Sequence, residues 1–256
     1  MNKLPAITLA FWVMKICATT LGETAGDLLS MTLDVGYAAS SLLLIGLFLL
    51  ALLAQLRARR YHPALYWTVI LATSTAGTTL SDFMDRSLEL GYATGSAILI
   101  GLLLATLALW RQTEKSLAVD DIRSRRGELF YWAAILFSNT LGTALGDYLA
   151  DDSGLGFAGG ALLIGGLLAA VALARYLTRL SPVLLFWLAF VLTRPFGATL
   201  GDFLTKAPTK GGLGFGTIGA SALLATTLVV LVAFAIRNTL RERLAVPAIT
   251  SPSAGA

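Results

Sequence analysis

Residues 12–27 read WVMKICATTLGETAGD, and the same pattern returns three times along the chain. It recurs at 67–82 as WTVILATSTAGTTLSD, at 132–147 as WAAILFSNTLGTALGD and at 187–202 as WLAFVLTRPFGATLGD. Each copy begins with tryptophan, has glycine ten residues later and ends with aspartate fifteen residues later. Because self-similarity at a fixed spacing is typical of repeat proteins, the chain is predicted to contain four copies of one structural unit.

The composition indicates a membrane protein. Hydrophobic residues make up 56% of the 256 residues, charged residues make up 13%, and the mean hydropathy is +0.76. These values exclude an ordinary soluble domain. A helix needs about 20 apolar residues to cross a bilayer, and eight runs of that kind are present at about 5–30, 36–56, 64–85, 91–110, 130–150, 156–176, 182–204 and 213–236. We therefore expect an all-α integral membrane protein with eight transmembrane helices.

The domain organisation follows the repeats. One membrane domain is expected over residues 1–246, as four helical hairpins at about 5–56, 64–110, 130–176 and 182–236. The first run carries the repeated Trp, Gly and Asp behind Lys3, so it is interpreted as structure and not as a signal peptide. The polar stretch 111–129 is predicted to be a cytoplasmic linker between halves. The tail 247–256, rich in Ser, Pro and Ala, is predicted to be disordered.

Charge predicts the orientation. Most of the 19 Lys and Arg lie at the N-terminus, between repeats or in the C-terminal tail, whereas Arg86, Lys206 and Lys210 lie near turns within repeats. The positive-inside rule then places both termini and the inter-repeat loops in the cytoplasm. The net charge of +4 is explained by this topology and gives no nucleic-acid signal. The lipid bilayer is the expected partner, and the sequence leaves the oligomeric state open.

The repeat geometry predicts a shared polar axis. Two membrane crossings per repeat give every repeat the same orientation, so a pseudo-fourfold or twofold axis along the membrane normal can relate them. With Trp at the cytoplasmic interface, a rise of ~1.5 Å per residue puts each aspartate ~22 Å away, in the outer half of the membrane. Small residues ten and fourteen positions past each Trp have the spacing that lets membrane helices approach closely.

Each first helix carries a polar stripe, because residues spaced by four, seven or eight share one helix face. Polar stripes on apolar helices turn away from lipid, so these side chains are candidates for binding an ion or substrate. The candidates are Thr20, Glu23, Asp27, Thr75, Thr78, Asp82, Thr140, Thr143, Asp147, Thr199 and Asp202.

Charge breaks the symmetry of the four copies. Glu23 adds an acid to the first repeat, Arg194 adds a base to the fourth, and Lys15 is a further base in the first. Since a buried charge is costly unless it is paired, Glu23 is expected to pair with Lys15 or Arg194.

The aspartates also differ in their neighbours. Two of them have a base four positions on, a spacing that favours ion pairs on a helix: Asp82 with Arg86, and Asp202 with Lys206. Asp27 and Asp147 have no such neighbour. We therefore expect Asp27 and Asp147 to be less involved in structural pairing.

The fourfold segment of Trp, T-x-G-x-x-x-G/S-D, G-Y/F turn and second helix resembles a family of bacterial membrane proteins built from four tandem two-helix repeats of unknown function. The resemblance covers about residues 5–236 and implies eight helices in a bacterial inner membrane. It implies no activity. The fourth repeat departs from the pattern, with Arg194-Pro195 where the others have a small polar residue followed by Thr.

The chemistry of the candidates favours hard ions. Carboxylates and hydroxyls suit Mg²⁺, Mn²⁺, Ca²⁺, Na⁺ or a proton. Cys17 and His62 are the only residues of their types, so neither a Zn²⁺ site nor an internal disulfide is expected, and no cofactor is predicted. The leading hypothesis is a transporter or exporter of a small hard cation, or of a cation- or proton-coupled solute.

Two alternatives remain open. The aspartates of a non-transporting scaffold or anchor protein would serve only as helix contacts. An enzyme would use paired aspartates as acid and base, but Thr24-Ala25-Gly26-Asp27 lacks the G-x-G-D of intramembrane aspartyl proteases. We therefore expect no catalytic activity.

Overall fold

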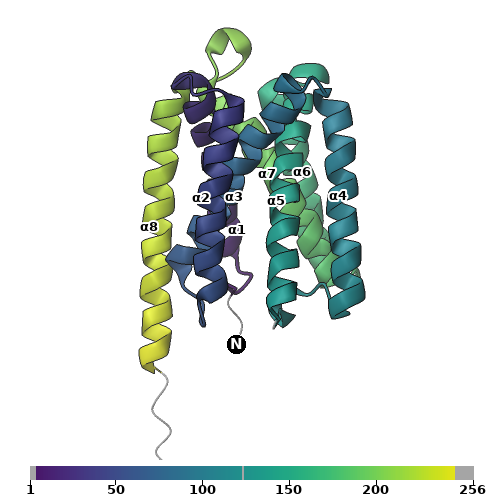
Figure 1. The fold of residues 1–256 in the computed structure, drawn as a ribbon, viewed down its shortest axis with the longest axis vertical. Helices are drawn as coiled ribbons and strands as arrows, with labels where there is room; N and C mark the ends of the chain where they lie inside the picture. The colour runs from purple at the N-terminus through teal and green to yellow at the C-terminus, as the bar shows by residue number, and fades with distance from the viewer. Residues whose placement is uncertain (1–3, 123, 246–256) are drawn as a thin grey trace, which may run out of the picture.

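A computed structural model describes residues 4–122 and 124–245 (Figure 1). Regular structure in these ranges is entirely helical, which confirms the all-α prediction. The eight long helices are α1 (Leu9–Asp27), α2 (Tyr37–Arg57), α3 (Pro63–Asp82), α4 (Gly91–Glu114), α5 (Arg125–Asp147), α6 (Gly156–Leu177), α7 (Pro182–Thr205) and α8 (Gly216–Ala245). The predictions for Lys3 and for the tail 247–256 lie outside the described residues.

Helix boundaries follow local signals in the sequence. The Thr8 hydroxyl accepts from the Phe11 amide at the start of α1, and the Ser124 hydroxyl accepts from the Gly127 amide at the start of α5. Proline opens α3 and α7, where a missing N–H costs nothing. Single π-helical turns at Leu28–Thr32, Phe83–Ser87 and Tyr148–Asp152 extend α1, α3 and α5.

Four inner helices form a closed ring. Helix α1 packs against α3, α3 against α5, α5 against α7, and α7 against α1. Around this ring, α2 packs on α3, α4 on α5, α6 on α7, and α8 on α1. Each outer helix thus packs mainly on the inner helix of the following repeat, and not on the inner helix to which its own turn joins it. The repeats interlock, and α8 closes the circle, with the Ser221 and Thr24 hydroxyls 2.9 Å apart.

The two ends of the ring carry different kinds of connection, and Figure 1 shows the chain's N-terminal end at the bottom. We call the end with the inter-repeat connections the linker end, and the end with the turns inside each repeat the turn end. The Trp residues belong to the linker end, and the four Asp residues of the repeats close the inner helices toward the turn end.

Six helical segments are long and apolar enough to cross a membrane: Tyr37–Arg57, Gly91–Glu114, Arg125–Asp152, Gly156–Leu177, Pro182–Thr205 and Gly216–Arg241. In the four outer helices only 17–28% of the apolar window is buried, which leaves leucine-rich faces free to contact lipid. Helices α1 and α3 do not qualify because of their polar and charged residues. Those side chains are buried inside the ring, where they do not meet lipid.

Small residues set the distances between the inner helices. A Cβ added to Gly22 would lie 2.3 Å from the Ser74 Cβ, closer than real atoms approach. The residue seven past each Trp packs on the glycine of the preceding inner helix, giving the pairs Gly22–Ser74, Gly77–Asn139, Gly142–Arg194 and Gly197–Thr19. One turn further along the helices, Thr78 packs against Gly26, Ala198 against Gly146 and Glu23 against Gly201. The neighbouring backbones therefore approach closely all round the ring.

Aromatic rings close the linker end. Their centroids form an unbroken circuit with spacings of 5.2–6.4 Å across all four inner helices. This aromatic girdle consists of Phe11, Tyr66, Trp67, Tyr131, Trp132, Phe186 and Trp187. The Tyr66 and Tyr131 hydroxyls, 2.7 Å apart, add a hydrogen bond.

Three of the four repeated tryptophans are buried between helices at the linker end. Trp67, Trp132 and Trp187 are only 2%, 0% and 6% exposed, whereas Trp12 is half-buried. Each buried indole packs on rings of the neighbouring inner helices, where its large aromatic surface contributes to the packing.

Replacement of Gly22 by alanine should destabilise the protein by about 1–3 kcal/mol, because the added methyl group overpacks the α1–α3 contact. Gly46 in α2 is the matched control, since nothing lies within 4 Å of its added Cβ. Thermal unfolding of the purified variants in detergent measures the difference. Equal unfolding temperatures for the Gly22→Ala and Gly46→Ala variants would contradict the close packing of the ring.

Candidate functional site

Arg194 occupies the centre of the ring. It is fully buried, and its Nη2 lies 2.9 Å from Oε2 of Glu23 on α1. The same nitrogen donates to Oγ1 of Thr78 on α3 at 2.5 Å and to Oγ1 of Thr143 on α5 at 2.6 Å. One guanidinium nitrogen from α7 therefore contacts all three other inner helices.

Three buried carboxylates converge beside this centre. Glu23, Asp147 and Asp202, from α1, α5 and α7, each supply one oxygen, and the three oxygens lie within 4.8 Å of one another. Hard cations bind oxygen at about 2.0–2.6 Å, so oxygens spaced in this way can share one ion. We call these three residues the carboxylate cluster.

Two bases at the turn end tie neighbouring helices together. Arg86 joins an aspartate of α3 to one of α5, and Lys206 joins an aspartate of α7 to one of α1. The distances are 3.1 Å from Arg86 Nε to Asp82 Oδ1, 3.1 Å from Arg86 Nη2 to Asp147 Oδ2, 3.0 Å from Lys206 Nζ to Asp202 Oδ1 and 3.2 Å from Lys206 Nζ to Asp27 Oδ2. The expectation that Asp27 and Asp147 are less involved in structural pairing is wrong, because these long side chains reach across to the adjacent repeat.

Both bases are partly open to solvent, with side chains 35% exposed for Arg86 and 27% exposed for Lys206. Lys206 follows the last residue of α7. Burial alone would lower the pKa of Lys206, but the carboxylates of Asp202 and Asp27 raise that pKa above its ordinary value. The ammonium group therefore stays charged at neutral pH and holds the two aspartates together.

The charges of the ring interior do not balance. Ion pairs within the described residues join five buried carboxylates to three bases: the acids are Glu23, Asp27, Asp82, Asp147 and Asp202, and the bases are Arg86, Arg194 and Lys206. If all eight groups are charged, two negative charges remain among these ion-paired groups, since five minus three leaves two. Lys15, a fully buried base outside these ion pairs, can offset one of them. Because uncompensated buried charge is costly, the rest of the excess calls for protons or a bound cation.

Lys15 lies apart from the carboxylates, on the side of Arg194 toward the linker end. Its Nζ is 3.4 Å from Oδ1 of Asn139 and 4.0 Å from the centroid of the Phe190 ring. Asn139 in turn donates to the Thr73 hydroxyl at 3.0 Å. Of the two partners considered for Glu23, the structure pairs it with Arg194.

The threonines of the polar stripes divide into two groups. Thr78 and Thr143 contact Arg194 at the centre of the ring. The other four donate to carbonyl oxygens of their own helices, at 2.9 Å for Thr20, 3.1 Å for Thr75, 2.9 Å for Thr140 and 2.9 Å for Thr199. The structure therefore does not bring these four hydroxyls to the carboxylate cluster.

Arg86 and Lys206 are the residues whose role sequence reasoning underestimated. Both lie nineteen residues past the Trp of their repeat, where the other two repeats have Met31 and Asp151. This alternation was a usable signal, because equivalent positions in a ring lie at the same level and long side chains there can reach the next helix. Asn139 also went unremarked as a contact of Lys15.

Fold and site together define a multi-pass helical membrane protein built from tandem repeats around a buried charged centre. The model of the DUF347 family, described as a Repeat of Unknown Function, matches residues 10–61, 65–116, 130–181 and 185–240. The chain belongs to this family, which confirms the resemblance to proteins of four tandem repeats. No curated protein and no solved structure matches the chain.

Removal of one member of the central ion pair should cost more stability than removal of both members. Arg194→Gln leaves Glu23 buried beside two threonines, with an expected destabilisation of about 3–5 kcal/mol. The double variant Arg194→Gln, Glu23→Gln removes both charges and should recover a substantial part of that loss. Unfolding of the parent, the two single variants and the double variant in detergent gives the coupling energy. A double variant no more stable than Arg194→Gln alone would show that the pair is not coupled.

Proposed function

We propose that the protein is a membrane transporter or exporter of a small hard cation, or of a solute coupled to a cation or proton. The observation that carries the proposal is the carboxylate cluster, in which three buried oxygens from three helices lie within 4.8 Å of one another. Intramembrane carboxylates are expensive, and they mark ion pathways and proton relays in other membrane proteins.

The oxygen ligands define the class of ion. Carboxylate oxygens from Glu23, Asp147 and Asp202 are hard ligands that favour Mg²⁺, Mn²⁺, Ca²⁺ or Na⁺ over soft metals. The excess negative charge of the ion-paired groups is neutralised by a bound cation or by protons. Since all of these satisfy the same carboxylates, protons and metal ions compete for one site.

The two ends of the ring offer different access to that site. The linker end is closed by the aromatic girdle, in which the rings of four helices touch one another. At the turn end, Arg86 and Lys206 lie next to the carboxylates and are partly exposed. In this conformation, an ion would enter and leave through the turn end by displacing these two bases from the aspartates.

The proposal includes the full topology. All eight helices cross the membrane, with the polar faces of α1 and α3 shielded inside the ring. The four repeats surround a pseudo-fourfold axis that the alternating bases Arg86 and Lys206 reduce to a twofold one. The protein lies in a bacterial inner membrane with both termini and the linker end in the cytoplasm, its partners are lipid and a small ion, and it is not an enzyme.

A scaffold or anchor protein is the second candidate, and one observation favours it. Arg86 and Lys206 engage all four repeated aspartates, so these carboxylates have a structural use without any transported ion. The two functions differ in which charges they require. A scaffold needs only the ion pairs that hold its helices together, whereas a transporter also needs the carboxylate charge that exceeds those pairs.

The double variant Asp147→Asn, Asp202→Asn tests this distinction. It removes two charges of the carboxylate cluster at nearly constant volume, while Arg86 keeps Asp82 and Lys206 keeps Asp27 as a partner. We expect normal insertion and purification, at least about a tenfold loss of cation affinity, and loss of flux in reconstituted vesicles. Calorimetry and flux assays with Mg²⁺, Mn²⁺, Ca²⁺, Na⁺ and a pH gradient make the measurement.

Asp152→Asn is the matched control, because Asp152 is an exposed acid in the turn after the same helix α5. It should leave ion affinity and flux unchanged. Full flux in the double variant, for an ion that the parent protein moves, would remove the carboxylate cluster from the mechanism. A parent protein that neither binds nor moves any of these ions would favour the scaffold.

The topology has its own test. Reporter domains fused after Arg243 or inserted within residues 111–129 should both read cytoplasmic, whereas one inserted near Lys210 in the last turn should read periplasmic. The reason is the concentration of Lys and Arg on the side of the linker end. A periplasmic signal at either of the first two sites would contradict the arrangement of eight crossings.

A further inference from the structure

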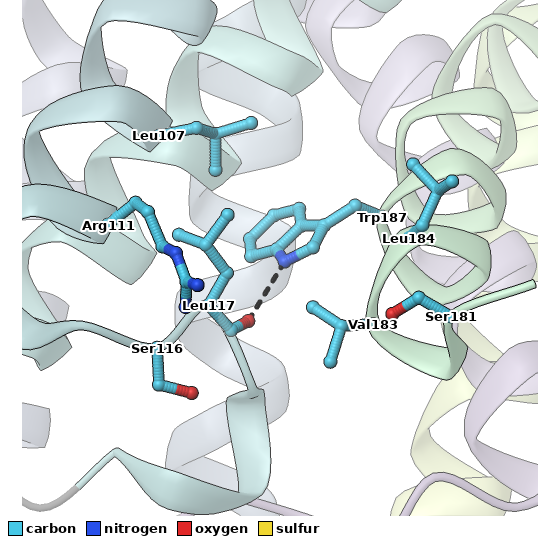
Figure 2. Close-up of a pocket in the computed structure, with 8 residues that line it drawn as sticks. All are labelled: Leu107, Arg111, Ser116, Leu117, Ser181, Val183, Leu184 and Trp187. Carbon is cyan, nitrogen blue, oxygen red and sulfur yellow. Dashed lines mark hydrogen bonds between the residues drawn. The ribbon is translucent and has the colours of Figure 1, made fainter.

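The connection between α4 and α5 is the longest one between repeats in the described structure, and it packs against the start of α7. Between Glu114 and Arg125 the chain folds over the start of α7, and Nε1 of Trp187 donates to the Leu117 carbonyl at 3.1 Å (Figure 2). The other connections, 58–62 and 178–181, are short. The longer connection therefore covers a surface at one place around the ring.

A cavity of about 390 Å³ lies under this connection, between α4 and α7. Its lining residues are Leu107, Arg111, Ser116, Leu117, Ser181, Val183, Leu184 and Trp187. Figure 2 shows the Trp187 ring between Leu107 and Leu117 on one side and Val183 and Leu184 on the other, with Arg111 and Ser116 together on the side of α4 and Ser181 on the side of α7. The cavity thus combines an apolar interior with a cationic and hydroxyl-bearing rim at the ends of the helices.

Arg111 is held at this rim. Its Nη1 donates to the Lys115 carbonyl, and the side chain remains exposed, with further N–H donors available. The exposed residues Lys115, Arg125 and Arg179 belong to the same end of the bundle. An anion at this side of the rim would therefore find the Arg111 guanidinium group and the Ser116 hydroxyl, with further bases at the same end of the bundle.

We propose that this cavity binds an anionic phospholipid from the leaflet at the linker end. The lipid phosphate contacts Arg111 and Ser116, and part of one acyl chain packs against Leu107, Val183 and Leu184. The mostly apolar lining favours a lipid over free phosphate, because a free anion would gain nothing from the interior surface. Basic pockets between membrane helices are a common form of lipid headgroup site.

The test uses the full-length protein, purified in detergent and depleted of lipid. Native mass spectrometry measures binding of phosphatidylglycerol and phosphatidylcholine with identical acyl chains. We expect one phosphatidylglycerol to bind at least about fivefold more tightly than phosphatidylcholine. Arg111→Gln should remove this preference, whereas Arg175→Gln, the same change at the exposed end of α6, should retain it.

A second variant distinguishes the contribution of the apolar cavity to lipid binding from that of the Arg111 charge. Val183→Phe fills the interior while Arg111 remains, and it should also abolish the preferred binding. Equal binding of the two lipids to the parent protein would overturn the proposal without any variant. So would undiminished preference in Arg111→Gln, or inorganic phosphate at millimolar concentration displacing the lipid from the parent, which would instead indicate a free-phosphate site.

Discussion

The close approach of four inner helices at their glycines is the constraint on which the rest of the structure depends. Where Gly22 meets Ser74 and Gly142 meets Arg194, an added methyl group would overlap a neighbouring side chain. This contact places the residues seven and eleven past each Trp between helices and turns their polar ends into the ring. Glu23 and Arg194 meet there, out of reach of lipid, while the leucine-rich outer helices supply the lipid-facing surface. Polar inner helices and apolar outer helices are therefore two consequences of one packing arrangement.

A ring of equivalent repeats concentrates like charges, and the chain counters this with unequal substitutions. Aspartate ends all four repeated segments, so symmetry alone would gather four carboxylates at one end of the ring. Bases at alternate repeats, Arg86 and Lys206, each form ion pairs with an aspartate of their own repeat and with one of a neighbour. The backbone keeps a fourfold order of contacts while the charges follow a twofold order. Glu23 and Arg194 break even that order, because each occurs in only one repeat.

The sequence predicts the elements and their faces well and their partners poorly. Spacing alone identified the repeats, the helical segments and the stripe that contains Glu23 and Asp27, because helical periodicity states which residues share a face. It does not state which helix that face meets. For this reason the hairpin predicted over 5–56 does not reveal that α2 packs on α3. The sequence also does not show how far a long side chain extends to a neighbouring helix. Lys206 has Asp202 four residues away in sequence, yet it also bonds Asp27, 179 residues away. The burial of Trp67 and Trp132 between helices is equally absent from the sequence pattern, because it depends on which rings pack on one another.

Different interactions close the two ends of the ring, aromatic contacts at the linker end and ion pairs at the turn end. This difference affects how such a protein would expose its carboxylates to the two sides of a membrane. At the linker end, opening would separate aromatic contacts on all four inner helices and the Tyr66–Tyr131 hydrogen bond. At the turn end, the ion pairs of the described residues join α3 to α5 and α7 to α1. These bridges favour motion of two pairs of inner helices relative to each other, dividing the ring at the α1–α3 and α5–α7 contacts. The Gly22–Ser74 and Gly142–Arg194 contacts lie at those two boundaries. Glu23 on α1 and Arg194 on α7 belong to the same pair of helices, so such a motion would keep their ion pair and would separate Arg194 from Thr78 on α3 and Thr143 on α5. Because those two hydroxyls accept hydrogen bonds from the buried guanidinium group, the shape of the ring is coupled to the environment of its central charge.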